Sequence, residues 1–161
     1  MGLFLNSIGI YDRYKTVTKG QYFVDKTALL EEIIPLLGQE QRFICITRPR
    51  RFGKTIMANM IGAFFEKGIE NRKIFDSFAI SKAEQYEEHI GKYNVIYIDF
   101  SEIPEGCKDY NSYIKRISDG IKSDLQDAFS YGICYQMCLR RRVKSLFLLW
   151  MNGMPRLIWN L

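Results

Sequence analysis

The sequence predicts an α/β protein in which helices flank a parallel sheet, and it predicts that this sheet is incomplete. Three observations indicate this fold. Two short apolar runs have the pattern of buried strands, and each is followed by a segment with helical periodicity. The last part of the chain shows neither pattern. Alternating strands and helices are typical of a parallel sheet covered by helices. The 161 residues are enough for one domain with a core.

The first half of the chain contains two predicted helices and one predicted strand. Residues 22–24 form a short extended run, and Asp25 is a suitable N-cap for a helix that reaches about Leu37. Residues 43–47 have the composition of a buried strand. Residues 55–66 place isoleucine, methionine and phenylalanine side chains at helical spacing, which predicts a helix packed on the sheet.

The second half continues the alternation as far as residue 128. A helical stretch is predicted from Ser81 to about His89. Residues 95–98, Val-Ile-Tyr-Ile, form a second buried strand that ends in Asp99. Residues 110–128 keep their isoleucine and leucine side chains in register, which predicts an amphipathic helix.

The loop between the first strand and its helix ends in Gly53-Lys54-Thr55. A strand, a short loop with this ending and a helix form the layout of a P-loop, which presents backbone N–H groups to a nucleotide phosphate. In a P-loop the lysine reaches the β- and γ-phosphates and the hydroxyl holds Mg²⁺. The sequence therefore predicts ATP and Mg²⁺ as cofactors, with Thr55 as the metal ligand. The predicted nucleotide-binding residues are Arg50, Arg51, Phe52, Gly53, Lys54 and Thr55.

One position departs from this motif. The P-loop motif has glycine at the position that Arg48 occupies in this chain. A residue with a side chain disfavours the positive φ that glycine permits there. Pro49 also removes one backbone donor. Arg50 and Arg51 either face the phosphates or are merely solvated. A second function therefore stays open, namely a non-enzymatic module whose degenerate P-loop and basic tail hold nucleic-acid phosphates.

Two segments resemble a known family. Residues 47–55, Thr-Arg-Pro-Arg-Arg-Phe-Gly-Lys-Thr, resemble the signature of the AAA-ATPase-like family of bacteria and archaea, in which arginine at position 48 is the normal form. Residues 22–27, Tyr-Phe-Val-Asp-Lys-Thr, are similar to its second marker. The resemblance covers about residues 1–128. It implies ATP hydrolysis that controls an effector domain, in many members a C-terminal nuclease-like domain of the PD-(D/E)XK type.

The second marker also has a simpler interpretation. Asp25 and Lys26 either contribute to the nucleotide pocket, or Asp25 only caps a helix and Lys26 only faces solvent.

Hydrolysis needs an acid that holds Mg²⁺ and orients water. Asp99 is a weak candidate for this catalytic role, because the resemblance implies that the family's Asp-Glu pair comes later in the chain. Residues 129–161 contain no Asp or Glu. We therefore expect impaired hydrolysis, and whether this chain is an enzyme stays open.

Residues 129–161 have no amphipathic period and contain five basic residues without an acid. Reverse translation of residues 148–155 permits a shifted frame that reads Val-Met-Asp-Glu-Trp-Asp-Ala. We therefore predict a truncated, frameshifted relative of a larger ATPase. Residues 1–128 are then the N-terminal part of its P-loop domain, and residues 129–161 are an out-of-frame tail. We expect this tail to be poorly ordered and unable to supply the native third strand, so that the sheet has an exposed edge or a mispaired strand. DNA sequencing across the end of the reading frame tests the shift.

Composition excludes several other classes of function. The net charge of +5 lies entirely in the tail, so it is poor support for a nucleic-acid partner, which we expect only through the missing effector domain. Four cysteines without zinc spacing and a single histidine disfavour a zinc site and a histidine-based triad. The sequence shows no signal peptide and no apolar run of bilayer length, which predicts a cytoplasmic protein without a membrane partner.

Overall fold

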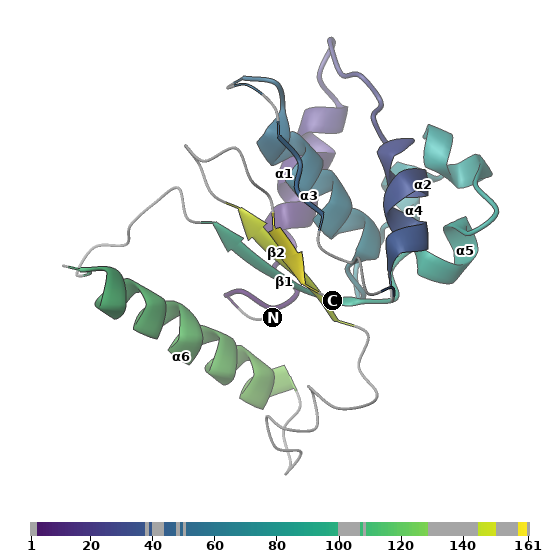
Figure 1. Cartoon of the computed structure of the whole chain (residues 1–161). Helices are drawn as coiled ribbons and strands as arrows, with labels where there is room; N and C mark the ends of the chain where they lie inside the picture. Colours follow the sequence, from purple (N-terminus) through teal and green to yellow (C-terminus); the bar gives the residue numbers. More distant parts are fainter. Residues whose placement is uncertain are drawn as a thin grey trace.

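The computed structural model describes residues 3–37, 39, 44–47, 49, 51–99, 107, 109–128, 145–150 and 158–160. The labels below are those of Figure 1. In chain order the helices and strands are α1 (Ile8–Thr18), α2 (Leu29–Ile33), η1 (Ile34–Leu36), α3 (Lys54–Phe65), α4 (Arg72–Phe75), η2 (Ala79–Lys82), α5 (Tyr86–His89), β1 (Asn94–Asp99), α6 (Tyr110–Ala128), β2 (Ser145–Trp150) and β3 (Ile158–Asn160).

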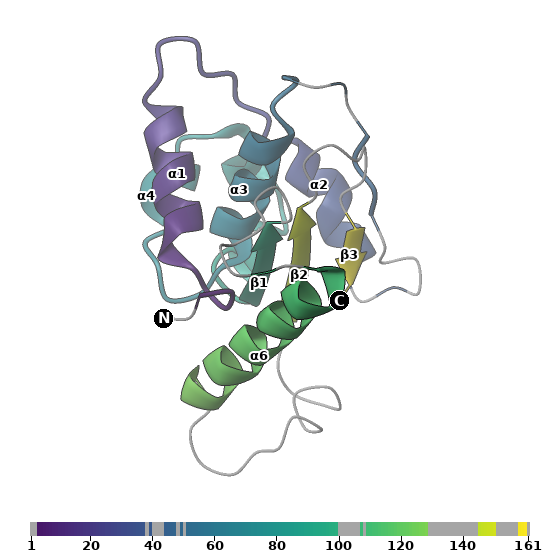
Figure 2. The same cartoon turned by 90° about the vertical axis from the view of Figure 1, so that its left-hand side faces the viewer.

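Strand β1 lies between two layers of helices. Its side chains alternate between two faces, as they do along any strand. Val95 and Tyr97 belong to the larger apolar cluster, which also contains residues of α1 to α5. Ile96 and Ile98 belong to a second cluster with the apolar face of α6. Figures 1 and 2 accordingly show α1 and α3 on one side of the sheet and α6 on the other.

The described strands form a mixed sheet in the order β1-β2-β3. β1 and β2 are parallel, with a register that runs from Asn94 opposite Ser145 to Asp99 opposite Trp150. β3 is antiparallel to β2. The chain is therefore a mixed α/β protein, but the sheet is not the purely parallel one that the sequence predicts.

Within the predicted tail, residues 145–150 and 158–160 form strands β2 and β3, and β2 pairs with β1. The physical reason lies in the pattern of a buried strand. A strand that is covered on both faces reads as a continuous apolar run, without the alternation of a half-exposed strand. Ser-Leu-Phe-Leu-Leu-Trp at 145–150 is such a run. The predicted frameshift itself stays a prediction.

The N-terminal residues cover the edge of β1 that faces away from β2. Leu5 forms an antiparallel bridge with Ile96. At the same place the carboxylate of Asp124 in α6 accepts hydrogen bonds from the backbone N–H groups of residues 3–5, at 3.0, 2.6 and 3.0 Å. The start of the chain is therefore held between β1 and α6.

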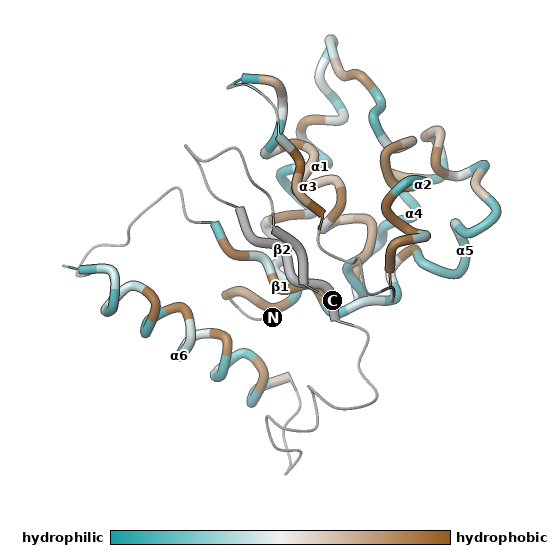
Figure 3. The backbone as a smooth tube through the Cα atoms, viewed as in Figure 1, coloured by the Kyte–Doolittle hydropathy of each residue, from teal (hydrophilic) through white to brown (hydrophobic). Residues whose placement is uncertain are grey.

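Three predicted elements are confirmed. The helix expected at 55–66 is α3, the strand expected at 95–98 is β1, and the helix expected at 110–128 is α6. Figure 3 shows the hydropathy patterns from which α3 and α6 could be predicted. α3 is hydrophobic over most of its length and is buried from Met57 to Phe65, whereas α6 alternates between hydrophobic and hydrophilic residues.

Other predicted elements need correction. The helix expected from Asp25 begins only at Leu29, and it tightens into the 3₁₀ turn η1 because Pro35 has no backbone N–H to donate. The helical stretch expected from Ser81 is divided into the short elements η2 and α5. Residues 44–47 are not part of a strand, since none of the described residues pairs with them; Phe43 lies outside the described residues.

Helix α1 was not predicted. Its Thr and Val residues have modest helix propensity, so its stability comes from packing against α3. Ile10 is 1% exposed at this contact. A Cβ atom on Gly62 of α3 would lie 2.8 Å from Cγ2 of Ile10, so the glycine permits the two helices to approach this closely.

Candidate functional site

The chain enters α3 through two residues with left-handed backbone conformations. Gly53, which precedes the helix, has φ of 76° and ψ of 23°. Arg51 has φ of 67°, which is uncommon for a residue with a side chain. No side chain caps the helix start, so the first N–H groups of α3 keep their hydrogen-bonding capacity. Together with the helix dipole, these groups favour an anion at this end of α3.

Lys54 and Thr55 occupy the first turn of this helix. The Lys54 ammonium group donates a hydrogen bond to the carbonyl oxygen of Pro49 at 3.0 Å, so it folds back over its own loop. Thr55 is exposed. The predictions for Arg48 and Arg50 lie outside the described residues.

A pocket of about 560 Å³ lies beside the helix start. Its walls come from the end of α1, the loop after α1, the loop before α3 and one face of α3. Arg51, Phe52 and Gly53 of the predicted nucleotide-binding set line it, whereas Lys54 and Thr55 do not. The lining residues are Tyr14, Val17, Gly20, Gln21, Tyr22, Phe23, Val24, Lys26, Arg51, Phe52, Gly53, Ile56, Met57 and Met60.

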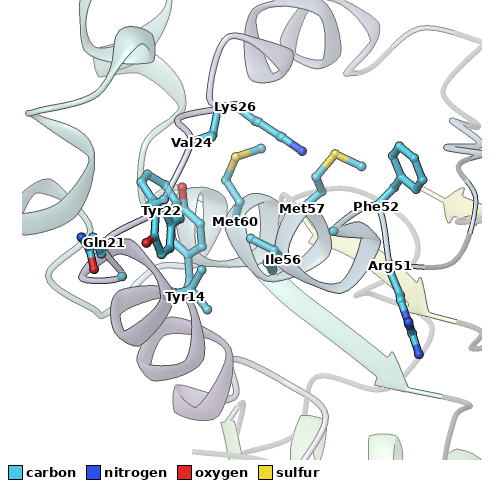
Figure 4. Close-up of a pocket in the computed structure, with 14 residues that line it drawn as sticks. Tyr14, Gln21, Tyr22, Val24, Lys26, Arg51, Phe52, Ile56, Met57 and Met60 are labelled. Atoms are coloured by element: carbon cyan, nitrogen blue, oxygen red, sulfur yellow. The ribbon is translucent and has the colours of Figure 1, made fainter.

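The pocket has an aromatic end and a basic end. Figure 4 shows Tyr22 at one end and Arg51 at the other, with Met57 and Met60 of α3 between them. Lys26 reaches over this middle part from the opposite segment. Among the described residues, the lining contains these two cations and no acid. A ligand that fits this distribution has an apolar, flat part and an anionic part.

The segment that carries Lys26 is fixed by the residues on either side of it. The Asp25 carboxylate accepts hydrogen bonds from the N–H groups of Thr27 and Ala79, each at 2.8 Å. The Ile80 N–H donates to the Thr27 hydroxyl at 3.2 Å. Asp25 therefore anchors this segment to the start of η2 and does not cap α2, which corrects the N-cap prediction.

Two opposing effects act on the pKa of Asp25. Burial raises the pKa, but the hydrogen bonds from the backbone of Ala79 and Thr27 outweigh it, so the pKa lies below its ordinary value of 3.8. The carboxylate therefore stays ionised, and the anchor intact, throughout the neutral pH range.

Lys26 points toward the loop before α3. Its ammonium nitrogen lies 3.8 Å from the position that a Cβ atom on Gly53 would occupy. The sequence left the role of Lys26 open between a pocket residue and a solvated side chain, and the structure places it in the pocket lining. The sequence held one indication of this position. Lys26 lies between the anchoring residues Asp25 and Thr27, and neighbouring side chains along an extended chain point in opposite directions.

Asp99 ends β1 but does not line the pocket. Its carbonyl oxygen accepts a hydrogen bond from the Tyr113 hydroxyl at 3.2 Å. The end of α3 meets the start of β1, where the Lys67 N–H donates to the Tyr93 carbonyl at 2.9 Å. Because α3 and β1 run in opposite directions, the start of α3 and the end of β1 lie on the same side of the molecule (Figures 1 and 2).

Within the described residues, no group of three or more His, Cys, Asp or Glu side chains is placed to hold a metal ion. A Mg²⁺ ion needs no such cluster, because it usually keeps several waters and binds through one or two protein groups and substrate phosphates. None of the helices in the described ranges is long and apolar enough to cross a membrane.

Comparison with known proteins gives one match. A family model described as "Predicted AAA-ATPase" matches residues 7–149. The matched range includes both loops of the pocket, β1, α6 and most of β2, so it extends beyond residue 128. Searches of curated proteins and of solved structures found no match.

Proposed function

Because the chain belongs to the predicted AAA-ATPase family, we propose that it binds ATP with Mg²⁺ at the start of α3. One observation carries this proposal. The left-handed residues Arg51 and Gly53 lead into a helix start without a side-chain cap, next to a pocket that contains cations and no acid. Backbone N–H groups and a helix N-terminus in this arrangement suit a phosphate group.

Each residue of the loop has a defined role in this proposal. Lys54 exchanges its hydrogen bond with the Pro49 carbonyl for contacts with the β- and γ-phosphates. The exposed Thr55 hydroxyl binds Mg²⁺, whose other ligands are phosphate oxygens and water. Arg50 and Arg51 face the phosphates, and the N–H groups from Phe52 onward complete the cradle.

Replacing Lys54 by alanine is expected to abolish ATP binding without unfolding the protein. The side chain contributes a charge to the ligand, and its ammonium group donates a hydrogen bond to the Pro49 carbonyl in the same surface loop, away from the core. Isothermal titration calorimetry with MgATP tests binding, and a thermal melt tests folding. Lys115→Ala, which removes an exposed lysine from α6, is the matched control. Equal MgATP affinities for the wild type and Lys54→Ala would refute the site.

The same protein preparation separates this function from nucleic-acid binding. Specific ATP binding requires Mg²⁺ and Lys54. Binding to nucleic-acid phosphates is independent of Mg²⁺ and falls steeply with salt, because each contact releases counterions. Binding of single-stranded DNA that persists without Mg²⁺ and weakens between low and high salt would favour the second function.

We further propose that this chain hydrolyses ATP very slowly or not at all. Asp99 lies opposite Trp150 in the register of β1 and β2, and no acid follows Trp150. The usual groups that hold Mg²⁺ and orient water contribute several kcal/mol to lowering the barrier.

A phosphate-release assay tests this expectation, with Asp99→Asn as the probe and Asp119→Asn, on the exposed surface of α6, as the control. The wild type should show little turnover. A rate typical of ATPases that Asp99→Asn abolishes and Asp119→Asn leaves unchanged would contradict the proposal and identify Asp99 as the catalytic acid.

A further inference from the structure

We propose that residues 22–26 form the base subsite of this pocket, in which Tyr22 and Val24 hold a nucleobase and Lys26 contacts the phosphates. This inference rests on the proposed function, because it assigns the part of the nucleotide that the loop before α3 does not hold. The ligand class is a nucleoside polyphosphate, with a flat aromatic group at one end and an anionic group at the other.

The first support is an alternation along the segment. Tyr22, Val24 and Lys26 line the pocket and are exposed. Phe23 also borders the pocket, but its ring packs against Phe78 with ring centroids 5.3 Å apart. Asp25 does not line the pocket and bonds to the backbone at the start of η2. An extended chain places alternate side chains on opposite faces. The segment therefore has one face that anchors it and one face that is presented to a ligand.

The second support is the exposure of large apolar side chains. Tyr22 is 88% exposed, Val24 67%, Phe52 58% and Ile56 38%. These are four of the seven exposed large hydrophobic residues in the described part of the chain, and all four line this pocket. Apolar side chains that gather in one exposed place indicate a binding surface. Aromatic faces suit a base, because every nucleobase can stack on them.

The third support is the distribution of polar groups. Lys26 reaches toward Gly53, and Arg51 lines the same end, so the positive charge adjoins the helix start that favours a phosphate. At the aromatic end, Tyr14 is 1% exposed and its hydroxyl has no hydrogen-bond partner among the described residues. The hydroxyl is not accessible to a ligand in this conformation, so Tyr14 contributes its ring to the apolar wall of the subsite.

Two probes separate the base subsite from the phosphate site. Isothermal titration calorimetry on the full chain compares MgATP with magnesium tripolyphosphate, which has the phosphates but no base. Tyr22→Ala should weaken MgATP binding by about tenfold, which is typical for loss of one base–aromatic stack, and should leave tripolyphosphate binding unchanged. Tyr22→Phe should restore MgATP binding. Lys26→Ala should weaken the binding of both probes.

Tyr110→Ala is the matched control, because Tyr110 is 74% exposed on α6 and does not line the pocket. It should change neither affinity. If the wild type binds both probes but Tyr22→Ala leaves MgATP binding unchanged, or weakens both probes equally, the base subsite is refuted while the phosphate site stands. If the wild type binds neither probe, the proposed function fails and the base subsite fails with it.

Discussion

Glu66→Gln is expected to make the protein more stable than the wild type at pH 8, by about 4 kcal/mol, and to leave its stability nearly unchanged at pH 4. Glu66 is 0% exposed, and neither of its carboxyl oxygens has a hydrogen-bond partner among the described residues. Burial raises its pKa from 4.5 to about 8. The folded protein therefore holds a neutral carboxyl group at pH 7, whereas the unfolded chain ionises it.

The sign follows from the proton balance. Below pH 4.5 both states hold the proton, so the group adds no pH dependence. Between pH 4.5 and 8 only the folded state holds it, and stability falls by about 1.4 kcal/mol for each pH unit. Above pH 8 both states are ionised and the loss is complete. Glutamine cannot ionise, so the stability of the variant does not fall with pH for this reason.

Urea denaturation of both proteins from pH 4 to pH 9 measures the effect. Glu84→Gln, at an exposed glutamate, is the control for the change in net charge. A stability difference between the wild type and Glu66→Gln that does not change with pH would show that the pKa of Glu66 is the same in the folded and unfolded states.

Asn71→Ala is expected to lower the free energy of unfolding by about 3 kcal/mol. The side-chain amide of Asn71 donates hydrogen bonds to the carbonyl oxygens of Ala63, Phe64 and Glu66, at 2.5, 3.3 and 2.8 Å. These are carbonyls at the end of α3, which have no intrahelical partner of their own. The Phe64 carbonyl also accepts a hydrogen bond from the Gly91 N–H at 2.9 Å. Asn71 is 5% exposed, so alanine would remove the amide partner of the Ala63 and Glu66 carbonyls without a replacement from water.

Chemical denaturation compares Asn71→Ala with Asn111→Ala, which removes an exposed asparagine from α6. The control should lie within about 0.5 kcal/mol of the wild type. A loss of less than about 1 kcal/mol for Asn71→Ala would mean that other groups satisfy the end of α3.

Sequence reasoning located the elements whose patterns are long or strongly periodic. α3, β1 and α6 were predicted to within one residue at each end, because their burial follows the periods of 3.6 and 2 residues. β2 was missed because its continuous apolar sequence has no period that distinguishes a strand from a poorly packed apolar run. Residues 44–47 resemble a strand in composition, but a strand also requires a partner, which local sequence does not specify.

The candidate site was predicted in part for a related reason. The motif residues Arg51, Phe52 and Gly53 line one pocket together because they are adjacent in the chain, and their binding of a nucleotide stays a prediction. Tyr14, Met57 and the residues of the 22–26 segment come from three separate elements that only the fold brings together. The contact of Asp25 with Ala79 spans 54 positions, and no local pattern distinguishes such an anchor from a helix cap. The effector domain, the frameshift and the cytoplasmic location stay predictions.

The position of the N-terminal residues sets the order in which the fold can be completed during synthesis. Residues 3–5 leave the ribosome before their backbone partners in β1 and at Asp124. Contacts between distant positions form slowly because a long loop must close. Residues 3–5 therefore reach their final place late in folding. A nascent chain halted before Asp124 emerges can form the backbone hydrogen bonds between residues 4–6 and β1, but it lacks the carboxylate that binds residues 3–5 to α6.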